Sequence, residues 1–252
     1  MSSNVLFIFE GKRAEPNIAR NLRDNILERD SKIVIQTSYG MNIYNLFNKI
    51  TKDEYFDTYD FIVQELEAKP NPTDDDLAVI AIEDPDVISE IYLFFDYDCH
   101  CSDADDDKIR QMVELFNDAQ NKGLLCVSYP MVEAIRHQRG LEPEYITHST
   151  TDLRNYKTWV NTSPEIDKQF QNWGLYTQAT WSNIAKQHLS RVNCLLTDAL
   201  ELPSEPVCMI KIFEQQMAKH RPHEQVAVIS GFPLMLLDHY GNDTFNILEV
   251  TN

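Results

Sequence analysis

Apolar runs of strand length recur along the first half of the chain, and each is followed by a polar or amphipathic segment. Such runs are typical of strands that are buried on both faces. Four strands are predicted in this way, over residues 4–9, 32–38, 90–96 and 124–128. Because helical patterns lie between them, the alternation predicts an α/β fold with a mostly parallel sheet flanked by helices.

Apolar positions at helical spacing predict connecting helices over residues 17–29, 42–50, 59–68 and 129–135. The segment Leu77–Ile82 fits either a strand or a buried helix. A further helix is predicted after the acidic loop at 103–107, because Asp residues favour a helix start. Gly123 would end this helix, and its apolar face would comprise Ile109, Met112, Val113, Phe116 and Ala119.

The pattern changes after residue 140, where Gly140, Pro143 and several Thr, Ser and Asn residues interrupt the alternation. Residues 1–140 are predicted to form one unit and residues 141–252 a mainly helical C-terminal region. A strand is expected to return at about 225–230, followed by a helix. The helical region is expected to pack Trp159, Phe170, Trp173, Tyr176, Trp181, Ile184, Leu189 and Val192.

Charge is unevenly distributed along the chain. The formal net charge of −18 argues by itself against a nucleic-acid ligand, since phosphate binding usually needs a basic surface. Residues 1–150 carry 14 Lys and Arg against 29 Asp and Glu, a balance of −15, and residues 151–252 carry 8 against 11, a balance of −3. The objection is therefore weaker for the C-terminal region. Much of the acid, including Asp74-Asp75-Asp76, is expected to be solvated surface.

Composition also bears on the environment of the protein. No stretch approaches the roughly 18 apolar residues of a membrane span, and the pattern after Met1 does not resemble a secretory signal. The five cysteines are odd in number and irregularly spaced, which favours reduced thiols over disulfides. These features predict a cytoplasmic protein with no membrane partner.

Carboxylates follow three of the predicted strands: Glu10 the first, Asp96 and Asp98 the strand at 90–96, and Glu133 the strand at 124–128. Ligands bind at the carboxyl ends of parallel strands, so these side chains are expected to lie close together, and Glu15 would join them. Asp96 and Asp98, two residues apart, are expected to share a face of the strand. Because such a cluster repels itself, one or two Mg²⁺ or Mn²⁺ ions are predicted.

Taken singly, the polar features of the chain fit simpler roles as well. Asp96 and Asp98 alone fit the solvated end of a strand, and Asp-Tyr-Asp occurs in aspartate-nucleophile phosphatases, although there it generally follows the first strand. Cys99-His100-Cys101 has zinc-ligand types at too tight a spacing. The basic residues at 219–223 fit a phosphate contact or a solvated helix end. The tryptophans are expected in the core rather than as platforms for bases.

Three segments resemble the signatures of toprim domains. They are Glu10-Gly11-Lys12-Arg13-Ala14-Glu15-Pro16, Phe95-Asp96-Tyr97-Asp98 and Ser128-Tyr129-Pro130-Met131-Val132-Glu133. The resemblance covers about residues 4–140 and is most similar to the RloB-like branch and to the overcoming-lysogenization-defect nucleases of bacterial anti-phage defence. It implies a toprim domain over residues 1–140 and metal-dependent phosphodiester chemistry.

The resemblance also implies roles for individual residues. Glu10 would be a metal ligand or general acid/base, and Asp96 and Asp98 would be metal ligands. Glu15 and Glu133 would support them or bind a second metal. Catalysis would then rest on Glu10, Asp96, Asp98 and Glu133.

The expected function is that of an Mg²⁺- or Mn²⁺-dependent nuclease acting on DNA or RNA, an effector of anti-phage defence by abortive infection. Toprim effectors often work beside an ABC-type ATPase, and because this chain has no Walker motif such an ATPase would be a separate partner. Lys12, Arg13 and Lys157 are candidates to contact the substrate phosphate. The alternative is a non-catalytic toprim-fold module that binds a protein partner; the sequence leaves a homo-oligomer open.

Overall fold

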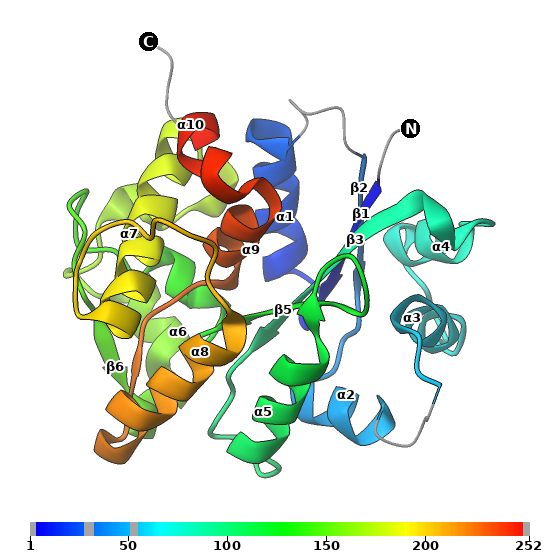
Figure 1. Cartoon of the computed structure of the whole chain (residues 1–252), viewed down its shortest axis with the longest axis horizontal. Helices are drawn as coiled ribbons and strands as arrows, with labels where there is room; N and C mark the ends of the chain where they lie inside the picture. Colours follow the sequence, from blue (N-terminus) through cyan, green and yellow to red (C-terminus); the bar gives the residue numbers. More distant parts are fainter. Residues whose placement is uncertain (1–3, 28–32, 51–54, 249–252) are drawn as a thin grey trace.

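The computed structural model of the chain describes residues 4–27, 33–50 and 55–248. Within them, the central sheet has the strand order β2–β1–β3–β5–β4 (Figure 1). Its strands are β1 (Asn4–Phe9), β2 (Ile33–Ser38), β3 (Ile88–Asp96), β4 (Asn117–Asp118) and β5 (Gly123–Ser128). All neighbours pair in parallel except β4, which pairs antiparallel with β5. The predicted α/β fold with a mostly parallel sheet is confirmed, whereas Lys32, predicted to start β2, lies outside the described residues.

Helices pack on both faces of this sheet. Successive residues of a strand point to opposite faces of the sheet. Because helices cover both faces, every residue of a continuous apolar run is buried. On one face, the ring of Phe94 stacks on Phe232 with 4.6 Å between centroids. On the other, Phe95 lies 6.3 Å from Tyr39, which lies 6.3 Å from Phe61. The helices are α1 (Ala14–Asn25), α2 (Ile43–Ile50), α3 (Thr58–Glu67), α4 (Asp74–Ile80), α5 (Asp106–Leu115), α6 (Leu153–Thr162), α7 (Gln178–Thr197), α8 (Met209–Gln215), α9 (Gly231–Tyr240) and α10 (Thr244–Leu248).

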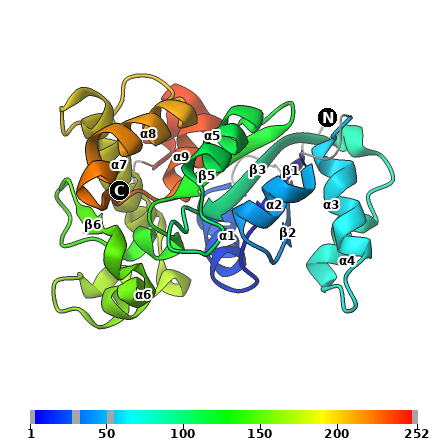
Figure 2. The same cartoon turned by 90° about the horizontal axis from the view of Figure 1, so that it is seen from below.

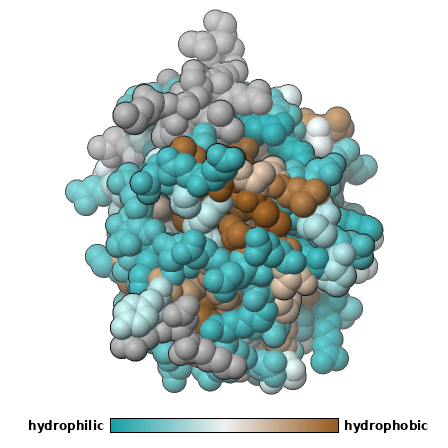
Figure 3. Space-filling model, turned by 90° about the vertical axis from the view of Figure 1, so that its right-hand side faces the viewer, coloured by the Kyte–Doolittle hydropathy of each residue, from teal (hydrophilic) through white to brown (hydrophobic). Residues whose placement is uncertain are grey.

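Helix α4 borders the edge strand β2. Because α4 extends to Ile80, the ambiguous segment Leu77–Ile82 begins as a helix. The expectation that Asp74-Asp75-Asp76 is solvated surface is wrong for Asp76, which is 1% exposed. Its Oδ1 accepts hydrogen bonds from the Thr37 hydroxyl (2.6 Å) and the Lys69 ammonium (3.0 Å). Figure 3 views this side of the molecule, where an apolar area lies within a mostly polar surface.

Two predicted helices end earlier than expected. Helix α1 ends at Asn25, and the remainder of the predicted segment beyond residue 27 lies outside the described residues. Helix α5 ends at Leu115 rather than at Gly123, because the chain turns into β4 and the Leu125 N–H donates to the Phe116 carbonyl. Gly123 instead starts β5 with φ of 103°, and a Cβ there would lie 2.7 Å from a methyl group of Leu93.

The chain after β5 also differs from its predicted structure. A short 3₁₀ helix spans Val132–Arg136, where a longer helix over 129–135 was expected. The peptide bond between Tyr129 and Pro130 is cis. The returning strand is β7 (Gln225–Ala227), shorter than predicted, and it pairs antiparallel with β6 (Thr147–Ser149) in a separate small sheet. The mainly helical C-terminal region is confirmed.

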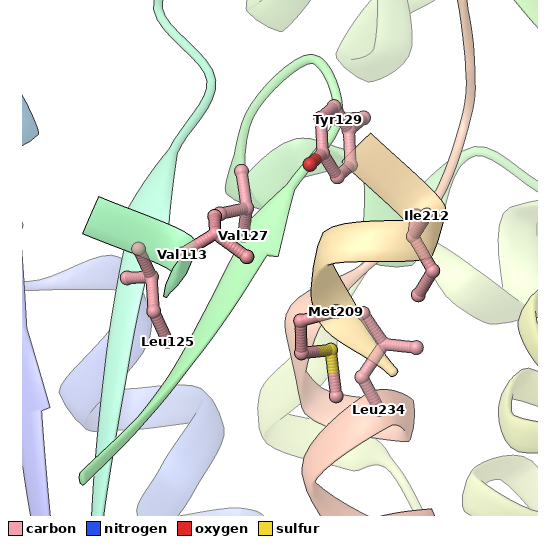
Figure 4. A pocket seen from close by; sticks show the side chains of 7 residues that line it. All are labelled: Val113, Leu125, Val127, Tyr129, Met209, Ile212 and Leu234. Carbon is pink, nitrogen blue, oxygen red and sulfur yellow. The ribbon is translucent and has the colours of Figure 1, made fainter. Parts of the chain in front are cut away.

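The C-terminal helices pack directly against the central sheet. Helix α9 begins so close to β5 that a Cβ on Gly231 would lie 2.5 Å from the Cys126 carbonyl oxygen. Beside it, α8 and α9 face β5 across an apolar seam too narrow for a water molecule. Figure 4 shows the side chains of this seam: Val113, Leu125, Val127, Tyr129, Met209, Ile212 and Leu234. Residues from before and after position 140 thus share one hydrophobic core.

Two further expectations concern the environment of the protein. None of the helices in the described ranges is both long and apolar enough to cross a membrane. The five cysteines all lie in these ranges and are free.

Of the predicted helical core, Phe170, Tyr176 and Trp181 are buried, whereas Trp159 and Trp173 are partly exposed.

Candidate active site

Glu10 directly follows β1 and joins it to β3. Its backbone N–H donates to the Phe94 carbonyl, and its side-chain Oε2 accepts a hydrogen bond from the Asp96 N–H at 3.0 Å. Burial raises the pKa of Glu10 to about 8; the bond from Asp96 lowers it, and repulsion from Asp98 and Glu15 adds to the rise. The first and second predicted motifs therefore meet at this carboxylate.

Glu15 folds back beneath the turn that links β1 to α1. It is 5% exposed, and its Oε1 accepts a hydrogen bond from the Gly11 N–H at 3.1 Å. A Cβ on residue 11 would lie 2.5 Å from Oε2 of Glu15, so a side chain there would displace the Glu15 carboxylate. Burial raises the pKa of Glu15, backbone hydrogen bonds lower it, Glu133 raises it and Lys157 lowers it. Glu15 therefore lies within the electrostatic reach of the third motif.

Asp96 ends β3 and pairs in register with Ser128 at the end of β5. Its side chain is partly accessible, and none of the described residues donates a hydrogen bond to its carboxylate. Burial raises the pKa of Asp96 well above its ordinary value, and repulsion adds to this from the other four carboxylates: Glu10, Glu15, Asp98 and Glu133. Asp96 is thus the carboxylate on which the cluster converges.

Asp98 lies near Asp96 for a reason that differs from the predicted one. The strand ends at Asp96, and Asp98 has φ of 27°, so the alternation of strand side chains does not extend to it. Its Oδ2 accepts a hydrogen bond from the Cys101 thiol at 3.1 Å, and its Oδ1 lies 3.6 Å from Nδ1 of His100. Its charge still raises the pKa of Glu10 and of Asp96.

Glu133 has cationic partners of its own. It is 2% exposed, and its Oε1 lies 2.9 Å from the Lys157 ammonium and 3.8 Å from the Arg136 guanidinium. Lys157 reaches it from α6 with a side chain that is 64% exposed. Of the three predicted substrate cations, Lys157 is therefore placed at the carboxylates. Lys12 and Arg13 are exposed at the turn before α1.

Sequence reasoning missed two buried arginines, of which Arg136 lies beside Glu133. Arg136 lies 4.4 Å from the ring centroid of Trp173 and donates to the side-chain carbonyl of Asn161 at 2.6 Å. Arg191 is fully buried and donates to the Glu144 carbonyl and, at 2.6 Å, to the side chain of Gln138. Arg136 follows Glu133 by three residues, a spacing that signals contact on a helical turn. Apart from Gln187, four residues earlier, the partners of Arg191 are distant in sequence, so its burial gives no signal.

The basic segment at 219–223 and Cys101 both make contacts with other residues of the chain. In the basic segment at 219–223, Lys219 pairs with Asp198 at 2.7 Å and Arg221 with Asp106 at 3.3 Å. These contacts favour a structural role for the segment over a phosphate contact. Near Asp98, Cys101 also accepts a weak contact from Asn42 at 3.9 Å.

The donor set suits a hard divalent cation in its chemistry. Carboxylate oxygens are the ligands that Mg²⁺ and Mn²⁺ prefer, and a cation would offset the burial of charge and the repulsion that together raise the pKa of Glu10 and Asp96. As placed, however, no three His, Cys, Asp or Glu side chains of the described residues are arranged to hold a metal ion. Glu10, Asp96 and Asp98 fit best as ligands, because they lie where β1 and β3 end and repel one another, whereas Glu133 is already paired with Lys157 and Arg136.

Comparisons with protein-family models, with curated proteins and with solved structures find no match for the chain. The toprim relationship therefore stays a prediction that rests on the three motifs. The structure shows a coarser feature, an α/β fold in which the three motifs follow the parallel strands β1, β3 and β5 at their carboxyl ends.

Proposed function

We propose that the chain is a metal-dependent nuclease that hydrolyses phosphodiester bonds in DNA or RNA, with a toprim-like catalytic site. The observation that supports this most directly is the hydrogen bond from the Asp96 backbone N–H to the Glu10 carboxylate. It lies at the centre of a carboxylate cluster built from the three motifs. Structural ion pairs rarely leave like charges clustered without cations, whereas sites for metal-assisted phosphoryl transfer require such clusters.

The residues divide into three roles in this proposal. Glu10, Asp96 and Asp98 hold Mg²⁺ or Mn²⁺, which when bound would activate water and stabilise charge on the leaving oxygen. Glu15 fixes the turn that presents Glu10, through the Gly11 N–H. Lys157, exposed and beside Glu133, supplies a cation that neutralises the phosphate as it approaches an otherwise acidic edge.

The C-terminal region supplies part of this site. Helix α6 carries Lys157, and α4 lies at the opposite end of the sheet (Figure 2). A substrate strand that crosses the carboxyl ends of the strands would meet both regions. The acidic surface favours a substrate delivered by a partner, and an ABC-type ATPase is our proposal for that partner.

Cleavage assays test the proposal. The purified chain is mixed with plasmid, tRNA and short oligonucleotides in Mg²⁺, in Mn²⁺ and in EDTA, and cleavage is expected only with a metal. The double substitution Asp96→Asn with Asp98→Asn removes two of the three proposed ligands and should abolish it, whereas Asp103→Asn in the nearby exposed loop should not. Cleavage that survives the double substitution contradicts the proposal. Absence of cleavage on every substrate, also with the partner ATPase added, favours the non-catalytic binding module.

A further inference from the structure

A small cavity lies on the β2 side of the candidate active site and has a volume of about 160 Å³. Its walls come from the turn before α1 together with α1, from the end of β2, and from the segment that leads into α4 together with the start of α4. Lys12, Arg20 and Lys69 contribute cations to the lining, and Ser38 and Thr73 contribute hydroxyl groups. The proposed nuclease mechanism does not use this cavity.

The carboxylates of the cavity are already bound. Asp76 accepts from Lys69 at 3.0 Å, and Asp75 lies 3.4 Å from the Arg20 guanidinium. Three cations against two carboxylates leave a surplus of one positive charge, contributed by Lys12, in a protein whose net charge is −18. The cavity is therefore a local exception to the acidic character of the chain.

The backbone directs Lys12 into this cavity and away from the carboxylate cluster of the candidate active site. The Gly40 N–H donates to the Glu10 carbonyl at 3.0 Å, which holds the end of β2 against the turn. A Cβ on residue 40 would lie 2.8 Å from Cε of Lys12, so the lysine side chain passes directly over Gly40. Gly40 also has φ of 82°, where a side chain is strained. The absence of a side chain at Gly40 therefore leaves room for Lys12, and the positive φ disfavours any residue that would fill this space.

Hydrogen-bond donors remain available in the cavity. Lys69 uses two of its three N–H groups, on the Ser38 carbonyl and on Asp76. The Thr73 hydroxyl accepts from the Asp76 N–H and keeps its own hydrogen to donate. Ammonium, guanidinium and hydroxyl groups are the side chains that most often contact nucleic-acid phosphates.

We propose that this cavity binds a phosphate of the substrate strand that flanks the phosphodiester being cleaved. The inference rests on the proposed nuclease function for the identity of the strand, but the phosphate-binding chemistry stands on the cavity itself. Lys12 follows Glu10 by two residues, so the cavity adjoins the site of cleavage. Its role is to position the strand, and Lys12 is accordingly a positioning residue.

Binding is tested without metal, so that cleavage does not enter the measurement. A short fluorescein-labelled single-stranded oligonucleotide is titrated with the full chain in EDTA over a range of salt concentrations. Lys12→Gln should weaken binding by about fivefold, and the slope of log K against log salt should fall by about 0.7, the change for one lost phosphate contact. Ser38→Asp, which places a negative charge in the cavity, should weaken binding similarly. Lys122→Gln, at an exposed lysine before β5, should change neither quantity.

Cleavage with metal separates the flanking site from the site of chemistry. Bis(p-nitrophenyl) phosphate has one phosphate and cannot reach a flanking subsite. Lys12→Gln should raise the KM for the oligonucleotide about fivefold and leave the hydrolysis rate of this small diester unchanged. An equal loss on both substrates places Lys12 at the scissile phosphate and overturns the inference.

The remaining outcomes distinguish this inference from the nuclease proposal. Oligonucleotide binding that depends on Lys12, without cleavage in any metal, refutes the nuclease and supports the phosphate subsite. Cleavage with Lys12→Gln indistinguishable from Lys122→Gln supports the nuclease and refutes the subsite. If inorganic phosphate binds in a Lys12-dependent manner and the oligonucleotide does not bind, the cavity holds free phosphate and the assignment to the substrate strand is wrong.

Discussion

The burial of Glu10 among like charges makes a quantitative prediction about the metal-free protein. Burial, with repulsion from neighbouring carboxylates, raises the pKa of Glu10 from 4.5 to about 8. Because the folded-state pKa lies above the unfolded one, the contribution of Glu10 to stability is fully present below pH 4.5 and is lost as the pH rises to about 8. At pH 7 the loss extends over about 2.5 pKa units, or at most about 3 kcal/mol at 1.36 kcal/mol per unit.

Substitution Glu10→Gln tests this reasoning, because the amide oxygen still accepts from the Asp96 N–H while the charge is removed. In EDTA at pH 7 the variant should be more stable than the wild type by up to about 3 kcal/mol, with a rise in Tm of roughly 2–4 °C per kcal/mol. The assays are urea unfolding and differential scanning calorimetry. The difference should largely disappear at pH 4, where the wild-type carboxylate is protonated in the unfolded as well as in the folded state.

Added metal should narrow the difference between the two proteins. Mg²⁺ at about 100 times its Kd stabilises the wild type by about 2.7 kcal/mol, and Glu10→Gln, with one ligand fewer, should gain less. The control is Glu114→Gln, an exposed glutamate on α5, which should alter neither the EDTA nor the Mg²⁺ result. If Glu10→Gln is less stable than the wild type in EDTA, burial and like charges do not penalise the carboxylate and the argument for a cation at this site fails.

Three further substitutions test other parts of the site and its support. Gly11→Ala should displace the Glu15 carboxylate and destabilise the fold by about 1–3 kcal/mol in urea unfolding, together with a loss of cleavage. Asp76→Asn should cost about 1–3 kcal/mol at pH 7; because hydrogen bonds outweigh burial and lower the pKa of Asp76, the wild-type advantage should fade as the pH drops below about 4. Lys157→Ala should cost about 1 kcal/mol by exposing Glu133 to repulsion, and Lys157→Arg should restore it.

Control substitutions and contrary outcomes complete these tests. Gly140→Ala, where a Cβ meets nothing within 4 Å, should leave stability and cleavage unchanged. Asp74→Asn, at an exposed residue beside Asp76, should leave the acid limb of the stability profile unchanged; a pH profile of Asp76→Asn parallel to the wild type contradicts the assigned hydrogen bonds. Lys157→Ala without effect on either stability or cleavage removes Lys157 from the site.

The apolar runs determined the strands, because a parallel sheet covered on both faces buries every residue of a strand and leaves a continuous pattern. The placement of Glu10 and Asp96 followed from the same rule, since parallel strands end at one edge. Helix ends were less well determined. The end of α5 depends on Leu125, which pairs with Phe116 only after the chain has turned back.

Tertiary structure alone decided the parts of the molecule that depend on distant partners. Asp76 is buried because Thr37 and Lys69 surround it, although a run of three acids resembles solvated surface. Arg191 is buried because carbonyl groups remote in sequence accept its hydrogen bonds. Local pattern records which residues must leave water, and the contacts that compensate buried charge arise only when the segments meet. The sequence thus determined the sheet and the acids at its edge, and the fold decided which charges are paired and which are left for a ligand.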